Sequence, residues 1–173
     1  MHTTASKITI MRMVLVPVFL VLVYTGHNVA GFLVYVLACL SDFVDGYVAR
    51  RYNQVTDFGK FMDPLADKIL VLAAMCFFVE RGMMPGWAVA IVLLREFAVS
   101  GLRLLAVEQQ RVIAAGWSGK IKTASTMVGL GLMLLFGGSK ALCLTVTAVI
   151  VITTVWSGVE YFVRNKDVFH ESK

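Results

Sequence analysis

Charged residues are scarce in this chain. Asp, Glu, Lys and Arg together make up 16% of the 173 residues, whereas 58% are hydrophobic. The mean hydropathy of +0.78 argues strongly against a water-soluble domain, in which about a quarter of the residues are charged. Most of the chain divides into apolar stretches close to the roughly 20 residues that cross a hydrocarbon core. The composition therefore predicts a membrane protein with little aqueous mass.

Cysteine and histidine are also rare, with three of each. The cysteines are isolated in apolar runs and show neither a CxxC motif nor the spacing of metal ligands, so they predict buried free thiols. They are Cys39, Cys76 and Cys143. The histidines lie near the termini or in a connector. Neither residue type supports a disulfide framework or a zinc site.

The net charge of +5 does not indicate nucleic acid as a partner. The basic residues lie at the ends of apolar stretches and form no solvated arm or basic repeat. We interpret them as topology signals and as part of a site for an anionic substrate.

Glycine, proline and charge divide the chain into six expected helices, an all-α polytopic membrane fold in one domain of residues 1–173. The expected ranges are 8–25, 29–50, 57–80, 86–108, 118–137 and 141–164. The positive-inside rule places the basic connectors, both termini and the active site in the cytoplasm. The inner (cytoplasmic) membrane is the expected location. Gly31, Gly129 and Gly131 predict close helix packing.

Four carboxylates are concentrated in one segment, Asp42 to Asp67. On a helix, Asp42 and Asp45 are i,i+3 neighbours, and Asp63 and Asp67 are i,i+4 neighbours, so each pair shares a face. The connection between the two expected helices is short, which makes the helices antiparallel neighbours. Both pairs are therefore expected to face one cleft at similar depth.

Neutralising these carboxylates requires positive charge. One buried carboxylate at mid-membrane costs about 3 kcal/mol, and four together also repel one another. Divalent metal is the simplest partner, and oxygen ligands favour Mg²⁺ or Mn²⁺ over zinc. Two such ions can bridge phosphoryl oxygens. The sequence therefore predicts a site for a diphosphate.

Small residues and an arginine accompany the carboxylates. Gly46 and Gly59 lie one helical turn from Asp42 and Asp63, and leave room for a nucleotide or phosphate to approach. Ala49 is similarly small. The Arg50 guanidinium can pair with phosphate oxygens. An inert set of solvated acidic residues at the membrane boundary would not explain this spacing.

The complete pattern resembles the signature of the CDP-alcohol phosphotransferase family. It runs Asp42-x2-Asp45-Gly46-x2-Ala49-Arg50-x8-Gly59-x3-Asp63-x3-Asp67. The resemblance implies transfer of a phosphatidyl group from CDP-diacylglycerol, or a related CDP-linked donor, to an alcohol. It implies that Asp42, Asp45, Asp63 and Asp67 bind metal, with Asp67 also the general base. The implied donor-binding residues are Thr9, Arg12, Asp42, Gly46, Ala49, Arg50 and Gly59. A homodimer is also implied.

Further motifs resemble the branch of that family whose acceptor is glycerol 3-phosphate. They are Ile8-Thr9-x2-Arg12-x4-Pro17, Arg95-Glu96-x3-Ser100-Gly101-Leu102-Arg103 and Gly119-Lys120-Ile121-Lys122-Thr123. Ser6 departs from the Asn that many relatives carry before the Ile-Thr pair. Acceptors such as serine or inositol phosphate remain the alternative.

The basic residues of these motifs have an independent physical interpretation. Unpaired cations in apolar helices are costly, so each needs an anion or a carboxylate. We expect Arg103, Lys120 and Lys122 to bind the acceptor phosphate. For Arg95, an ion pair with Glu96 is as plausible as substrate contact.

Two alternatives stay open at this point. Thr9 and Arg12 are expected on the nucleotide side, but a helix cap and a cation reaching the membrane surface would explain them equally well. A membrane ion transporter would also use intramembrane carboxylates. An ion transporter would leave Gly46, Gly59 and Arg50 unexplained.

Overall fold

The computed structural model describes residues 4–52, 57–108, 110, 113 and 116–169, and leaves the side chains of 4–10, 42–52, 57–67, 108 and 168–169 outside the description. The elements are α1 (Thr4–Tyr24), α2 (Asn28–Tyr52), α3 (Asp57–Glu80), α4 (Gly86–Glu108), α5 (Trp117–Phe136), α6 (Lys140–Arg164) and the 3₁₀ turn η1 (Lys166–Phe169). Every element in the described part of the chain is helical. The prediction of six helices is confirmed, and α3 and α4 begin and end where the sequence places them.

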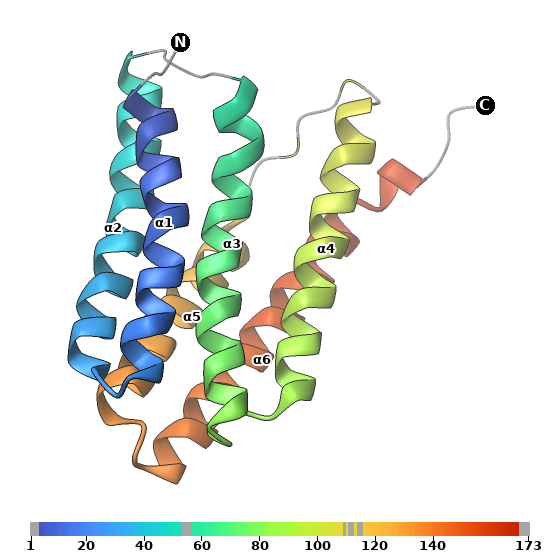
Figure 1. The fold of residues 1–173 in the computed structure, drawn as a ribbon. Coiled ribbons are helices and arrows are strands. Elements are labelled where there is room, and N and C mark those ends of the chain that lie inside the picture. The colour runs from blue at the N-terminus through green and yellow to red at the C-terminus, as the bar shows by residue number, and fades with distance from the viewer. Residues whose placement is uncertain (1–3, 53–56, 109, 111–112, 114–115, 170–173) are drawn as a thin grey trace.

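The helices form a bundle with two distinct ends (Figure 1). The tight turns that join α1 to α2, α3 to α4 and α5 to α6 lie at one end. The first turns of α1 and α3 and the last turns of α2 and α4 lie at the other end. The carboxylate segment spans the α2–α3 connection and therefore belongs to this second end, which we call the carboxylate end.

Two glycines end helices at the turn side of the bundle. Gly26 follows α1 with φ +85°, and Gly82 follows α3 with φ +67°. In each case the next residue donates its backbone N–H to the carbonyl five positions earlier, at 2.9 Å: His27 to Leu22 and Met83 to Phe78. This is the Schellman arrangement, in which a left-handed residue satisfies the last carbonyls of a helix.

Three other glycines allow close helix approach, as the sequence predicts. A Cβ atom on Gly31 would lie 2.5 Å from Val23 Cγ1, and one on Gly129 would lie 2.7 Å from Val146 Cγ1. A Cβ on Gly131 would lie 3.3 Å from the Phe32 ring. These contacts join α1 to α2, α5 to α6, and α5 to α2. Small residues therefore set the spacing of the bundle.

The outer surface of the bundle is apolar. On α2, Val29, Leu33 and Leu37 are exposed, while Tyr35 and Ala38 on the opposite face are buried. Large apolar side chains also lie on the outside of the other five helices. Exposed apolar surface on this scale is unusual for a soluble monomer and fits contact with lipid.

Among the described residues, α6 is the one helix both long and apolar enough to cross a membrane, with a mean hydropathy of 2.1 over its best window. Shorter apolar helical stretches occur at Met11–Tyr24 and Asn28–Ser41. No disulfide joins the three described cysteines; Cys143 is buried and Cys39 is partly buried. The expectation of a buried thiol is wrong for Cys76, which is exposed, because it lies on an outward face of α3.

Candidate active site

The helix bounds place the four predicted metal ligands at matching depths. Asp42 lies ten residues before the end of α2 at Tyr52, and Asp67 lies ten residues after the start of α3 at Asp57. At 1.5 Å per residue, each is about 15 Å along its helix from the carboxylate end. Asp45 and Asp63 lie one turn nearer to that end. The backbone therefore permits the cleft that the sequence predicts.

The side chains of this segment lie outside the described residues. The predicted site residues affected are Thr9, Asp42, Asp45, Gly46, Ala49, Arg50, Gly59, Asp63 and Asp67. Among the side chains that are described, no group of three or more His, Cys, Asp or Glu residues forms a metal site. Four carboxylates on two neighbouring helices still offer the oxygen ligands that a hard divalent cation prefers.

Arg12 is the predicted donor-site residue whose side chain is described. It lies on α1, which packs against both α2 and α3. Its side chain is fully buried, with 0% exposure. The structure therefore contradicts the alternative in which Arg12 reaches the membrane surface. Arg12 instead places its charge inside the bundle, eight residues from the start of α1.

The most concentrated group of described charges surrounds Glu96 on α4. Its Oε1 atom accepts hydrogen bonds from Lys122 Nζ of α5 at 2.6 Å and from Arg95 Nη1 at 2.9 Å. Lys68 Nζ of α3 lies 3.6 Å from the other oxygen, Oε2. One carboxylate thus joins cations from three helices. The ion pair between Arg95 and Glu96 is present, but it is part of this larger cluster.

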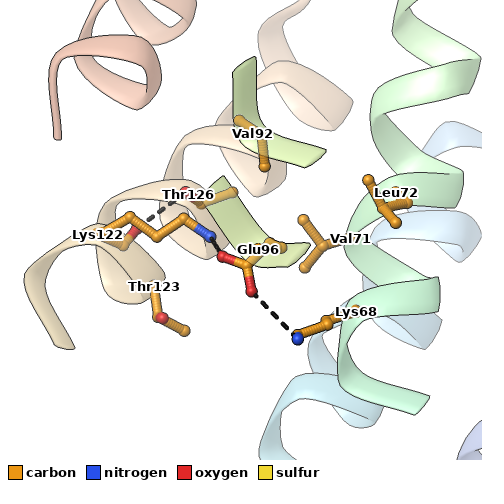
Figure 2. A pocket seen from close by; sticks show the side chains of 8 residues that line it. All are labelled: Lys68, Val71, Leu72, Val92, Glu96, Lys122, Thr123 and Thr126. Atoms are coloured by element: carbon orange, nitrogen blue, oxygen red, sulfur yellow. Dashed lines mark hydrogen bonds and ion pairs between the residues drawn. The ribbon is translucent and has the colours of Figure 1, made fainter. Parts of the chain in front are cut away.

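Three members of this cluster, Lys68, Glu96 and Lys122, line a pocket between α3, α4 and α5 (Figure 2). The lining residues are Lys68, Val71, Leu72, Val92, Glu96, Lys122, Thr123 and Thr126. Figure 2 shows Glu96 between Lys122 and Lys68, with Val71, Leu72 and Val92 lining the same pocket. Lys68 follows Asp67 directly in the chain, so their Cα atoms are about 3.8 Å apart. The pocket therefore adjoins the carboxylate segment.

Arg95 also reaches α6. Its Nη2 atom donates to Ser157 Oγ at 2.7 Å. The arginine side chain lies beside two glycines: a Cβ on Gly158 would be 3.3 Å from Arg95 Cγ, and a Cβ on Gly119 would be 3.6 Å from Nη2. The absence of side chains at these glycines leaves space for a buried guanidinium. Arg95 is therefore held by both Glu96 and α6.

The other two predicted acceptor residues lie outside the Glu96 cluster. Arg103 donates from Nε to the hydroxyl of Tyr161 at 3.0 Å, and its guanidinium carbon lies 5.6 Å from the centre of the tyrosine ring. Lys120 is exposed, and its Nζ lies 4.8 Å from the centre of the Trp117 ring. The structure therefore brings Lys122 and Arg95 together and places Arg103 and Lys120 with aromatic partners.

Four polar residues that contact this basic set were given no role from the sequence, although Ser100 stands in one of the motifs: Lys68, Ser100, Ser157 and Tyr161. Lys68 Nζ donates to Ser100 Oγ at 2.6 Å. A usable signal existed for Lys68, because a lysine that follows a buried carboxylate in a membrane helix needs an anion or another acceptor. The serines and the tyrosine carried no such signal.

Comparison with known proteins decides the family. The model of the CDP-alcohol phosphatidyltransferase family matches residues 2–159. The chain belongs to this family. The family match covers α1 to α5 and most of α6, and so includes both the carboxylate segment and the Glu96 cluster.

Several curated relatives match this family member along most of its length. A CDP-diacylglycerol–glycerol-3-phosphate 3-phosphatidyltransferase of Bacillus subtilis is 37% identical, with 99% of this chain and 100% of the relative covered. A probable phosphatidylglycerophosphate synthase of Mycobacterium tuberculosis is 38% identical over 92% of this chain and 80% of its own length. An Escherichia coli protein has the same name as the Bacillus relative. It is 37% identical, with 75% of this chain and 75% of the relative covered.

Proposed function

We propose that this protein is a phosphatidylglycerophosphate synthase. It transfers the phosphatidyl group of CDP-diacylglycerol to glycerol 3-phosphate and releases CMP. The observation that carries this proposal is the charge cluster around Glu96, where three cations surround one carboxylate and two of them line a pocket next to the carboxylate segment. An excess of positive charge suits an acceptor that itself carries a phosphate. The names of the similar Bacillus and Escherichia proteins support the same acceptor.

The protein acts as a single polytopic domain of residues 1–173, with six membrane-spanning helices. This arrangement is supported by the apolar outer surface of the bundle. Both termini and the carboxylate end face the cytoplasm, because the basic connectors lie there, and the membrane is the inner (cytoplasmic) one. The acyl chains of the donor stay in the leaflet while its head group enters from the cytoplasmic side. Two copies form a homodimer.

The carboxylates Asp42, Asp45, Asp63 and Asp67 hold two Mg²⁺ or Mn²⁺ ions. When bound, these ions supply the positive charge that neutralises the diphosphate of the donor. The small residues Gly46, Ala49 and Gly59 leave space for the cytidine diphosphate. Arg50, Arg12 and Thr9 bind it from α2 and α1.

The reaction is a direct substitution at phosphorus. Asp67 takes the proton of the primary hydroxyl of glycerol 3-phosphate. The hydroxyl oxygen forms a bond to the phosphorus attached to diacylglycerol, and the bond from that phosphorus to the bridging oxygen of CMP breaks. Arg50 stabilises the charge that develops on the departing phosphate. Arg103, Lys120, Lys122 and Arg95 orient the acceptor through its phosphate.

A CMP-release assay tests this function. Purified protein in detergent is expected to release CMP from CDP-diacylglycerol only when both glycerol 3-phosphate and Mg²⁺ or Mn²⁺ are present. CMP release with serine or inositol phosphate in place of glycerol 3-phosphate would overturn the acceptor and leave the family assignment intact.

A membrane ion transporter is the remote alternative from another functional class. It predicts cation flux in proteoliposomes without CDP-diacylglycerol. The same preparation can therefore be assayed for both activities. Flux without CMP release would contradict the enzyme.

A further inference from the structure

Within the described part of the site, the cations around Glu96 outnumber the carboxylates. Among the described side chains, Lys68, Arg95 and Lys122 surround one glutamate, which leaves a formal excess of two positive charges. The Lys122 side chain is 7% exposed and that of Arg95 is 13% exposed. Cations in such an environment are stable only when further negative charge is close. A phosphate monoester carries a charge close to −2 at neutral pH, which matches the excess.

The two lysines are held in different ways. Lys122 donates directly to Glu96 Oε1 at 2.6 Å. Lys68 lies 3.6 Å from Oε2, which is too long for a hydrogen bond, and it donates instead to Ser100 Oγ at 2.6 Å. The Lys68 side chain is also the most exposed of the three cations, at 29%. Lys68 is therefore the cation that can most easily turn toward a ligand.

The lysines approach the same pocket from opposite sides, with Glu96 between them (Figure 2). Lys122 enters from α5 and Lys68 from α3. The exposed Thr123 hydroxyl lines the pocket beside Lys122. The Thr123 hydroxyl donates to the Gly119 carbonyl at 3.0 Å, so the pocket offers its two ammonium groups to a single oxyanion. It lies beside the backbone of Asp67, the proposed base.

We propose that Glu96 is a positioning residue for the acceptor phosphate, and that Lys68 binds this phosphate together with Lys122. Glu96 holds Lys122 by a hydrogen bond and attracts Lys68 from 3.6 Å, so that both ammonium groups face one pocket. The excess positive charge of the described cluster selects a phosphorylated acceptor over a neutral one. This proposal rests on the proposed function of the same site. It adds two residues, Lys68 and Glu96, and assigns them separate roles.

Glu96 could either position the two lysines or only neutralise their charge. These two roles predict opposite changes in phosphate binding when Glu96 is removed. If Glu96 only neutralised the lysines, its removal would raise the positive potential and tighten phosphate binding. If Glu96 positions them, its removal lets the two ammonium groups repel each other and move apart, and binding weakens. The direction of the change in the KM for glycerol 3-phosphate therefore decides between them.

The test uses the full chain purified in detergent and measures CMP release. Glu96→Gln is expected to raise the KM for glycerol 3-phosphate about 10- to 100-fold, because hydrogen bonds to charged groups are lost. The KM for CDP-diacylglycerol is expected to change less than about threefold. The preference for glycerol 3-phosphate over glycerol, measured as a ratio of kcat/KM, is expected to fall by the same 10- to 100-fold.

Two milder variants test the same role in case Glu96→Gln does not fold. Ser100→Ala removes the hydrogen-bond partner of Lys68 without changing any charge, and is expected to raise the KM for glycerol 3-phosphate about three- to tenfold. Glu96→Asp keeps the charge on a shorter side chain and is expected to fall between wild type and Glu96→Gln. The matched control is Glu160→Gln, which removes an ion-paired glutamate of α6 outside the pocket.

Each outcome has a separate meaning. A wild-type protein that is inactive with glycerol 3-phosphate contradicts the proposed function. An active wild type whose KM for glycerol 3-phosphate is unchanged or lowered in Glu96→Gln overturns the positioning role. If that variant does not fold, an unchanged KM in both Ser100→Ala and Glu96→Asp overturns it equally.

Discussion

The Nζ atom of Lys122 lies 2.6 Å from Oε1 of Glu96, and this contact joins α5 to α4 inside the bundle. The lysine is almost fully buried and the glutamate nearly so. Arg95 extends the link to Ser157 of α6, and Lys68 extends it to α3. A single carboxylate therefore ties four helices together at the level of the proposed active site. Under the proposed function, structure and substrate binding depend on the same charges there.

Breaking this contact is expected to destabilise the protein. Lys122→Met removes the closest partner of Glu96, which keeps its hydrogen bond from Arg95. Loss of one hydrogen bond between charged groups typically costs about 1.5–3 kcal/mol. We expect a lower midpoint of thermal unfolding in detergent and a higher KM for glycerol 3-phosphate. The double variant Lys122→Met/Glu96→Gln is expected to lose less stability than the sum of the single variants, with a coupling of about 1–3 kcal/mol. Additive losses would show that the contact contributes little.

Close packing of α1 on α2 gives a second prediction. A methyl group on Gly31 would meet Val23 Cγ1 at 2.5 Å, so Gly31→Ala is expected to cost about 1–3 kcal/mol through overpacking. Val23→Ala removes the clashing atom and is expected to restore part of the loss in the double variant. Gly138→Ala is the control, because its Cβ would meet nothing within 4 Å. Equal melting temperatures for Gly31→Ala and the control would contradict the close approach.

The contact between Arg103 and Tyr161 gives a third prediction. Tyr161→Phe keeps the ring beside the guanidinium but removes the hydroxyl that accepts from Arg103 Nε. If Arg103 binds the acceptor phosphate, loss of this one hydrogen bond is expected to raise the KM for glycerol 3-phosphate about two- to tenfold with little change in kcat. A change confined to the KM for CDP-diacylglycerol would place Arg103 on the donor side.

The sequence predicted the helices well because glycine and proline mark their ends. Gly26 and Gly82 adopt the left-handed backbone that ends α1 and α3, and the tight packing at Gly31 and Gly129 follows from their size. The sequence also placed the end of α4 at residue 108, although the left-handed residue that follows this helix is Gln110, with φ 57°, and not a glycine. The short turn η1 carried no clear signal.

For the described part of the site, the sequence predicted the ion pair of Arg95 with Glu96 as one of two possibilities but not the other pairings of the cations. The need of each buried cation for an anion was evident, and so was Glu96 as one partner. The choice of partner depends on how α3, α4, α5 and α6 pack, which periodicity within one helix does not determine. For that reason the sequence grouped Arg103 and Lys120 with Lys122, whereas the structure pairs them with Tyr161 and Trp117.

Substitution of the proposed base gives a fourth prediction. Asp67→Asn removes both a proton acceptor and a metal ligand, and is expected to lower kcat at least about 10²- to 10⁴-fold. The melting temperature and the elution volume on size exclusion should stay close to wild type. Asp167→Asn, a change of the same chemistry at an exposed position in η1, should keep full activity. Retention of activity in Asp67→Asn would exclude this residue as the base.

Metal removal gives a fifth prediction. Chelation with EDTA is expected to abolish CMP release, and Mg²⁺ or Mn²⁺ is expected to restore it, because the four carboxylates offer only oxygen ligands. Zn²⁺ should restore little activity. Full activity after exhaustive chelation would contradict a divalent-metal site in the carboxylate segment.

The identity of the acceptor is the central claim, and transfer of labelled glycerol 3-phosphate tests it most directly. Purified protein is incubated with CDP-diacylglycerol, Mg²⁺ and glycerol 3-phosphate labelled in its carbon chain, alongside equal concentrations of serine and inositol phosphate. The label is expected to enter the lipid phase as phosphatidylglycerophosphate, with one CMP released for each molecule formed. Release of CMP without label in the lipid, or with serine or inositol phosphate found in the lipid product instead, would contradict it.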